Sequence, residues 1–307
     1  MEQSQGKNLK RAAKMRIEAH TIGDENQKKE IEDKINKAEV EIKKSGQKAV
    51  SITDPESRIM ENKKKRNELS YNPQITVDHD SGIIVANDVT QDCTDHLQLQ
   101  PQLEMTEENV GKLPKETKVS ADNGYFTGDN LRYLEEKKLD GYIPDGNLAT
   151  KMKGNKRNDS LYSKDKFEYD GERDCFICPN GDVLVKKGEY EYNGKVQYHY
   201  YGAKCSECPS RADCAGVGKM RSIISDAYEA QRKRMLNKMG SAGGKEEYKK
   251  RKETVEWPFG NIKQNLGLRE FFTRGLESVK TEHNLACIAH NLTVMWSKMG
   301  KNVGILC

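Results

Sequence analysis

The chain has 307 residues, of which 35% are hydrophobic and 33% charged, and its formal net charge at pH 7 is +4. This length can bury one or two cores, but the high charge content leaves much of the chain at the surface. No apolar run approaches the roughly 18 residues that a membrane span requires, and the first residues lack the hydrophobic stretch of a signal peptide. The composition therefore argues against an integral membrane protein and predicts a cytoplasmic one.

Residues 1–66 are dominated by Lys, Glu, Asn and Gln. Within them Ile31, Ile35, Ala38 and Ile42 recur at steps of four, three and four, a narrow apolar stripe typical of a helix or a short coiled-coil arm. We therefore predict a charged helical arm here and assign it no function of its own.

The periodicity changes in residues 67–150, where strand and turn signals begin. Ile75 and Val77 alternate with polar neighbours, Asp80-Ser-Gly82 supplies a turn, and an apolar run follows it. The pattern predicts a β-hairpin over residues 72–90, followed by a helix over residues 95–109.

A second strand is predicted over residues 117–121, and it ends at Asp122 before an Asn-Gly turn. Thr127 can cap a following amphipathic helix that carries Leu131 and Leu134. Open α/β sheets place ligand chemistry at the carboxyl end of a strand, although an aspartate is also a common initiator of such turns. Asp78 and Asp95 lie at similar strand or helix ends, and turn formation explains them equally well.

Five of the eight cysteines fall in residues 151–222, as Cys175-x2-Cys178 and Cys205-x2-Cys208-x5-Cys214. In a cytoplasmic protein such cysteines are thiols or metal ligands rather than disulfides. The two Cys-x2-Cys pairs match tetrahedral zinc held by thiolates, and the Tyr-rich stretch from residue 183 to 201 can form the hairpin of a zinc ribbon. Reduced cysteines packed in a small insertion, or a redox pair, remain alternatives.

Beyond about residue 222 the pattern is helical, with a break at residues 241–245. On the helix after this break Lys252, Glu256 and Lys263 are four and seven residues apart, so they are predicted to share one face. A solvated Lys–Glu face would look the same, but Trp257-Pro258 directly after the acid is unusual for one. Pro258 is expected to kink or restart the helix just beyond Glu256.

The last helix is predicted to place one set of apolar residues on a single face. His283 and His290 lie seven apart on this helix and are expected to be packing or surface residues rather than ligands, since no acid or cysteine stands beside them at matching spacing. Local basic clusters at residues 63–66, 232–234 and 249–252 are of the kind that contacts phosphates or forms solvated faces. The members of the apolar face are Leu285, Ile288, Ala289, Leu292 and Met295.

Together these motifs resemble the DDE transposases of bacterial insertion sequences, in the group with a Tyr-Arg-Glu-Lys signature. The resemblance runs from about residue 50 to 298 and covers the second-aspartate and glutamate motifs. One departure is that Tyr248 and Arg251 stand one residue early, so Lys252 covers the face that the arginine of the family occupies. The similar segments are residues 53–60, 70–78, 121–126, 248–263, 274–279 and 282–291.

The resemblance implies an incomplete α/β, ribonuclease H-like fold in four parts: a helical arm (1–66), the first part of the catalytic domain (67–150), a Cys-rich zinc-ribbon-like insertion (151–222) and a helical part (223–307). It implies Asp122 and Glu256 as catalytic ligands of Mg²⁺ or Mn²⁺, and DNA contacts by Tyr248, Arg251, Lys252 and Lys263. The cysteines that match the insertion of the family, and would hold structural Zn²⁺, are Cys178, Cys205, Cys208 and Cys214.

A serious departure is that no strand bearing the first of the three carboxylates is evident before residue 70. Asp78 or Asp95 would have to replace it. Two hypotheses follow: a DNA transposase that cleaves and joins transposon ends and target DNA, with a homo-oligomer on the DNA, or a zinc-stabilised nucleic-acid-binding remnant without chemistry. Cleavage with Mg²⁺ or Mn²⁺ distinguishes them.

Overall fold

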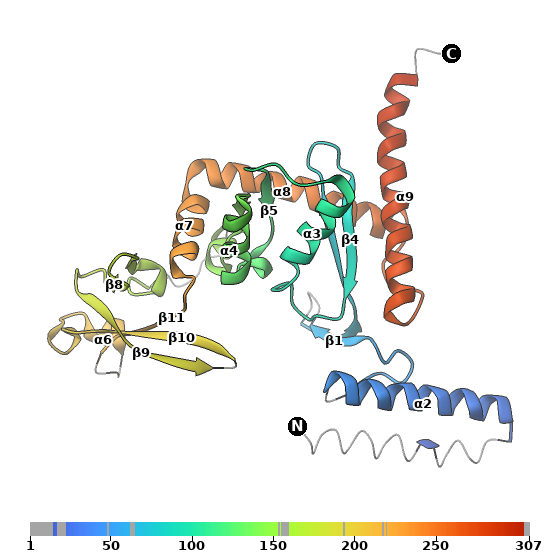
Figure 1. Cartoon of the computed structure of the whole chain (residues 1–307), viewed down its shortest axis with the longest axis horizontal. Coiled ribbons are helices and arrows are strands. Elements are labelled where there is room, and N and C mark those ends of the chain that lie inside the picture. Colours follow the sequence, from blue (N-terminus) through green and yellow to red (C-terminus); the bar gives the residue numbers. More distant parts are fainter. Residues whose placement is uncertain are drawn as a thin grey trace. The chain divides into compact units, whose positions relative to one another are not determined.

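The computed structural model describes residues 15–16, 23–47, 49–61, 65–152, 154, 160–192, 194–216, 218 and 220–303 (Figure 1). Its elements fall into two compact units: the first joins Met1–Gly111 to Glu253–Cys307, and the second is Lys112–Lys252. The chain mixes helices and strands, so the α/β class is confirmed. No helix among the described residues is long and apolar enough to cross a membrane.

The first unit opens with the helix α2 (Glu25–Ser45), coloured blue in Figure 1. Asp24 caps its start by accepting hydrogen bonds from the N–H groups of residues 26 and 27, and Gly46 ends it in the left-handed conformation at φ 65°. The predicted stripe is its buried face, because Ile35, Ala38 and Ile42 are at most 6% exposed. The helix predicted in this arm is therefore confirmed over residues 25–45, whereas residues 1–14 lie outside the described part of the chain.

The predicted hairpin is the centre of the first unit. β3 (Asn72–Val77) pairs antiparallel with β4 (Ile84–Thr90), so the hairpin over residues 72–90 is confirmed. The predicted helix that follows is α3 (Leu99–Val110), which starts four residues later than expected because residues 95–98 form a turn. The other elements of this unit are the antiparallel pair β1 (Arg58–Glu61) and β2 (Asn67–Ser70), the end of α8, the π-helix η4 (Asn261–Asn265) and α9 (Leu276–Val303).

The long helix α9 packs on β4 through a face that differs from the predicted one. Of the predicted set, Leu285, Ile288, Leu292 and Met295 are 51–62% exposed. They do share one side of the helix, so the predicted apolar face is confirmed, and this side faces solvent. Periodicity detects the most apolar face, whereas the inner face contains histidines and a cysteine: Val279, His283, Ala286, Cys287, His290 and Val294.

His283 and His290 are buried, so the prediction that they are packing residues is confirmed. His290 accepts from Asn261 Nδ2 at Nδ1 (3.0 Å), and its Nε2–H donates to the Gly82 carbonyl (3.2 Å). Asn261 cannot turn to accept a proton from His290 without losing its Oδ1 bond from Asn265. Burial lowers the pKa of both histidines below the usual value.

This burial predicts acid sensitivity. Above about pH 6.5 the two histidines are neutral in both the folded and the unfolded chain, so they do not change the free energy of unfolding with pH. Below this pH the unfolded chain binds protons on these histidines and the folded chain does not, so stability falls. We expect the free energy of unfolding to drop by up to about 1.4 kcal/mol per histidine per pH unit below 6.5. Urea titrations between pH 7.5 and 5.5 measure this; His290→Gln should reduce the slope, and the exposed-site control His96→Gln should not.

The second unit has two parts, a parallel strand pair covered by helices and a separate antiparallel sheet. In the first part, β5 (Lys118–Ser120) pairs parallel with β6 (Asp140–Tyr142), and α4 (Gly128–Lys137) packs against β6. Thr127 caps α4 through Asn130 N, and Leu131 and Leu134 are buried, so this predicted strand–turn–helix is confirmed. The helices that complete this part are α5 (Gly146–Met152), α7 (Glu229–Gly240) and the start of α8 (Ala242–Gly260).

The other part is an antiparallel sheet of five strands in the order β11-β10-β9-β8-β7. The predicted Tyr-rich hairpin is its centre, formed by β9 and β10 (Figure 1, yellow). Phe167, Phe176, Leu184 and Tyr200 are fully buried on one face, and Asp174 accepts hydrogen bonds from the hydroxyls of Tyr169 and Tyr200. The strands are β7 (Glu168–Asp170), β8 (Cys175–Ile177), β9 (Val183–Tyr192), β10 (Lys195–Gly202) and β11 (Ser222–Ser225).

Candidate active site and cysteine pocket

Asp122 follows β5 directly and lies at the carboxyl end of the strand. Its Oδ1 accepts a hydrogen bond from Gly124 N (2.8 Å) and so starts the short helix η1 (Asn123–Tyr125). Its Oδ2 lies 3.6 Å from a guanidinium nitrogen of Arg251, and the side chain is 41% exposed. The carboxylate therefore has a structural role in the turn, and its second oxygen still faces solvent and a cation.

Arg251 and Tyr248 lie on α8, in the same unit as Asp122. The side chain of Arg251 is only 21% exposed. Burial raises the pKa of Tyr248, which keeps its hydroxyl protonated at neutral pH. Arg251 therefore lies where it can orient Asp122, a role that sequence reasoning missed because no local pattern links residues 122 and 251. The DNA contacts predicted for Tyr248 and Arg251 stay predictions.

Glu256 lies near the end of α8 and is exposed. The helix does not restart just beyond the acid, since α8 continues through Pro258 to Gly260 and then widens into the π-helix η4. A kink at Pro258 stays a prediction. Pro258 has no N–H to donate to the carbonyl four residues earlier, and the change of hydrogen-bond pattern follows within three residues. Among the described residues no ion pair involves Glu256.

The residue after Glu256 fixes this stretch to the turn of the β3–β4 hairpin. The Trp257 ring packs edge-on against His290, with 4.8 Å between ring centroids. It also lies over Gly82, where an added Cβ would come within 2.9 Å of the ring. His79 Nδ1 and Thr254 Oγ1 are hydrogen-bonded at 2.6 Å. The helix end that carries Glu256 is thus held by packing on both sides of the acid.

Gly82→Ala tests this packing. Both Gly82 (φ 70°) and Gly46 (φ 65°) are left-handed, but an added Cβ meets nothing within 4 Å at Gly46. We expect Gly46→Ala to cost about 1 kcal/mol for the strained backbone, and Gly82→Ala about 1–3 kcal/mol more because the indole must shift. Urea unfolding of the two variants measures the difference, and equal losses would contradict the role of the Trp257 contact.

Lys252 and Lys263 are exposed on either side of Glu256 along the chain. Lys263 Nζ lies 5.6 Å from the centroid of the Phe259 ring. Because Lys263 belongs to the π-helix, the α-helical spacing that placed it on the face of Glu256 no longer applies at its position. Lys252 and Glu256 are separated by one turn of regular α-helix, so these two do share a face.

Asp122 belongs to the second unit and Glu256 to the first. That the two acids share one cation-binding pocket stays a prediction. The two possible substitutes for the first carboxylate are engaged in local hydrogen bonds: Asp78 Oδ2 accepts from Ser81 N, and Asp95 Oδ1 accepts from Asn72 and Gln74 at 2.8 Å each. Both have the turn or bracing role that ordinary acids have at such positions.

The basic cluster at residues 232–234 is used within the second unit rather than left free for phosphates. Arg232 forms a two-bond pair with Asp226, and Arg234 pairs with Glu135 in the same way. Lys233 donates to the Phe167 carbonyl at 2.6 Å, and burial lowers its pKa. This cluster holds α7 to its neighbours through these contacts.

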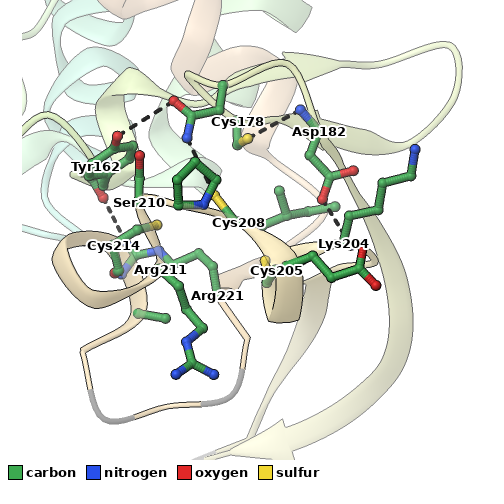
Figure 2. Close-up of a pocket in the computed structure, with 15 residues that line it drawn as sticks. Tyr162, Cys178, Asp182, Lys204, Cys205, Cys208, Ser210, Arg211, Cys214 and Arg221 are labelled. Atoms are coloured by element: carbon green, nitrogen blue, oxygen red, sulfur yellow. Dashed lines mark hydrogen bonds between the residues drawn. The ribbon is translucent and has the colours of Figure 1, made fainter.

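Four cysteines line one pocket beside the five-stranded sheet, with a volume of about 500 Å³ (Figure 2). Cys178 comes from the turn after β8, Cys205 and Cys208 from η3 (Cys205–Glu207) and its end, and Cys214 from α6 (Arg211–Ala215). Cys175 does not line this pocket; it lies in β8 and is 3% exposed. These four are the cysteines that the family resemblance selected.

The turns around these sulfurs have the hydrogen bonds that suit thiolates. Asp182 N donates to Cys178 Sγ (3.2 Å), and Asn180 Nδ2 donates to Cys208 Sγ (3.5 Å). Gly202 leaves the space that Cys205 Sγ fills, since a Cβ there would overlap the sulfur. Asn180 and Asp182 were not singled out from the sequence, although the Pro-Asn-Gly turn after Cys178 was a usable signal.

Burial raises the pKa of the Cys214 thiol, and the neighbouring pocket cysteines raise it further while Arg221 lowers it. Burial also raises the pKa of Cys175. Within the described residues, no three His, Cys, Asp or Glu side chains are placed so that they could hold one metal ion as they stand. The donor set of four thiols with N–H···S bonds fits zinc by its chemistry, whereas the sulfur positions do not close around an ion.

Exposed acids at a strand end and near a helix end, accompanied by lysines, are typical of metal-dependent proteins that act on nucleic acids. Residues 177–296 match the family model of the transposase DDE domain. Within this segment the match confirms the resemblance to DDE transposases that was found in the sequence. The match contains Glu256 with both lysines and the four pocket cysteines, and it begins after Asp122 in the chain, so it does not include this residue. Comparison with curated proteins and with solved structures gave no match.

Proposed function

We propose that the chain is a DNA transposase of the DDE type, which cleaves DNA and transfers strands at the ends of an insertion sequence. The observation that carries this proposal is the match of residues 177–296 to the transposase DDE domain, with Glu256 exposed between Lys252 and Lys263 inside it. Asp122 and Glu256 are the proposed catalytic carboxylates. The partners are the transposon ends and the target DNA.

Carboxylate oxygens are the hard ligands that Mg²⁺ and Mn²⁺ prefer, and both acids have oxygens open to solvent. When bound, such a metal activates the attacking oxygen and stabilises the leaving one in phosphoryl transfer. The protein residues have separate tasks: Asp122 and Glu256 hold the metal, Arg251 orients Asp122, and the lysines contact the DNA backbone without reading its sequence.

A ribonuclease H-like sheet is part of the proposal. β5 and β6 are a parallel pair of three residues each, with Asp122 directly after β5. Parallel strands occur almost only inside larger sheets covered on both faces, which supports the view that this pair belongs to a larger sheet. The boundaries at residues 66, 150 and 222 are proposed from the sequence alone, and the two compact units divide at other residues.

The second part of the proposal is structural Zn²⁺ held by Cys178, Cys205, Cys208 and Cys214. The four thiols line one pocket and two of them accept hydrogen bonds from neighbouring N–H groups. Zinc would join the turn after β8 to η3 and α6, a region that buries little apolar surface of its own.

The alternative is a zinc-stabilised DNA-binding remnant without chemistry. One observation favours it: Asp78 and Asp95, the possible substitutes for a first catalytic carboxylate, are engaged in local hydrogen bonds. Incubating the chain with terminal inverted-repeat DNA and Mg²⁺ or Mn²⁺ tests the two. Nicked or joined products support the transposase, and salt-sensitive binding without any product supports the remnant.

A further inference from the structure

The exposed side of α9 carries six large apolar side chains within fifteen residues. Each is more than half exposed, and the indole of Trp296 is the most exposed at 77%. An apolar patch that exposes several hundred Å² on a soluble domain marks an interaction surface. We call this surface the α9 stripe; its members are Leu285, Ile288, Leu292, Met295, Trp296 and Met299.

The spacing of the α9 stripe identifies the shape of its partner. Leu285, Ile288, Leu292, Met295 and Met299 follow one another at steps of three, four, three and four, which is the a/d pattern of a coiled coil. The opposite side of α9 is already occupied, because Ala286, Cys287, His290 and Val294 are buried against the first unit. The α9 stripe is therefore a second, separate seam that fits another helix.

Charge indicates that this other helix belongs to a second copy of the chain. Residues 284–297 contain no Asp, Glu, Lys or Arg, so two identical stripes can meet without like-charge repulsion. A membrane-surface helix would need a basic polar face, whereas the other face of α9 is buried protein.

We propose that the chain forms a dimer in which the α9 stripes of two copies pair as a short coiled coil. The contact is the same patch on both copies, as in a two-fold symmetric dimer. Trp296 flanks the a/d seam and covers its edge. Self-association through α9 requires neither DNA nor metal, so it can be tested without assaying the proposed transposase activity.

Sedimentation equilibrium of the full chain at about 1–100 μM is the test. Since the seam spans only two heptads, we expect a reversible dimer with a dissociation constant of micromolar order. Leu292→Asp should weaken dimerisation at least about tenfold, because two charges would be buried at the seam. Val40→Asp is the matched control: Val40 is 64% exposed on α2, outside the stripe, and its replacement should change nothing.

A charge-swap experiment separates a true seam from misfolding. Leu292→Asp should associate with Leu292→Lys if the helices are parallel. If they are antiparallel, it should associate with Ile288→Lys or Met295→Lys, according to the register, while each variant alone stays weak. Circular dichroism confirms that the variants keep the helical content of the wild type. A wild-type monomer at every concentration, a dimer that Leu292→Asp leaves intact, or failure of all three mixtures would overturn the proposal.

Discussion

Asp122→Asn and Glu256→Gln are each expected to abolish metal-dependent cleavage and strand transfer while DNA binding persists. The amide replacements keep the size of the side chain but remove the negative charge that holds a divalent cation. Loss of a metal ligand removes several kcal/mol of transition-state stabilisation, which corresponds to a rate decrease of at least about 10³-fold. A gel assay with labelled terminal-repeat DNA and Mg²⁺ measures both cleavage and binding.

Glu253→Gln is the matched control for the glutamate. Glu253 is an exposed acid on the same helix, three residues before Glu256, and its replacement should leave cleavage within about twofold of wild type. Cleavage that survives in both Asp122→Asn and Glu256→Gln would show that other residues hold the metal.

In Lys252→Ala, the affinity for DNA should weaken equally for all DNA sequences and become less dependent on salt concentration.

Local signals account for the elements that the sequence predicted well. The hairpin β3–β4 follows from alternation before Asp80-Ser-Gly82 and an apolar run after it, and α4 follows from the Thr127 cap before Leu131 and Leu134. In each case the residues that determine the structure lie within ten positions of one another. Such determinants can be read without knowledge of the rest of the fold.

The features that were missed depend on contacts between distant residues. β11 needs β10 beside it, and the hydrogen bond from His290 needs the carbonyl of Gly82, about 200 residues earlier. The more apolar face of α9 faces solvent because polar hydrogen bonds, such as those of Asn291 with Ile84, attach the other face to β4. Periodicity ranks faces by hydrophobicity, and it cannot detect which face is held by specific polar bonds.

The candidate site divides in the same way. The family resemblance selected Glu256 and the four pocket cysteines, whereas spacing alone also allowed Cys175 as a ligand. Neither gave a sign that Arg251 faces Asp122 or that the Trp257 ring lies over Gly82. The supporting contacts of an active site join separate segments, so they become visible only when the chain is folded.

We expect the chain to bind one zinc ion through Cys178, Cys205, Cys208 and Cys214. Cobalt substitution should give the absorption of a tetrahedral thiolate site, and a chelator should release four reactive thiols. Replacing Cys178 or Cys208 by serine should lower zinc affinity at least about 100-fold, because the ion loses a ligand and the N–H···S bond that orients it.

Cys175 tests which four cysteines hold zinc. The sequence spacing allows Cys175 as a ligand, whereas in the structure it lies outside the pocket. It lies in β8 with 3% of its surface exposed, outside the pocket that the other four line. Cys175→Ala should therefore keep one zinc ion while the sheet loses about 1–2 kcal/mol of packing, and Cys93→Ser, at an exposed position, should change neither. Loss of the ion in Cys175→Ala, or its retention in Cys208→Ser, would mean that the ligand set is different.

Because the pocket lies beside the sheet core rather than within it, removal of zinc by a chelator should loosen η3 and α6 first and leave β9–β10 paired.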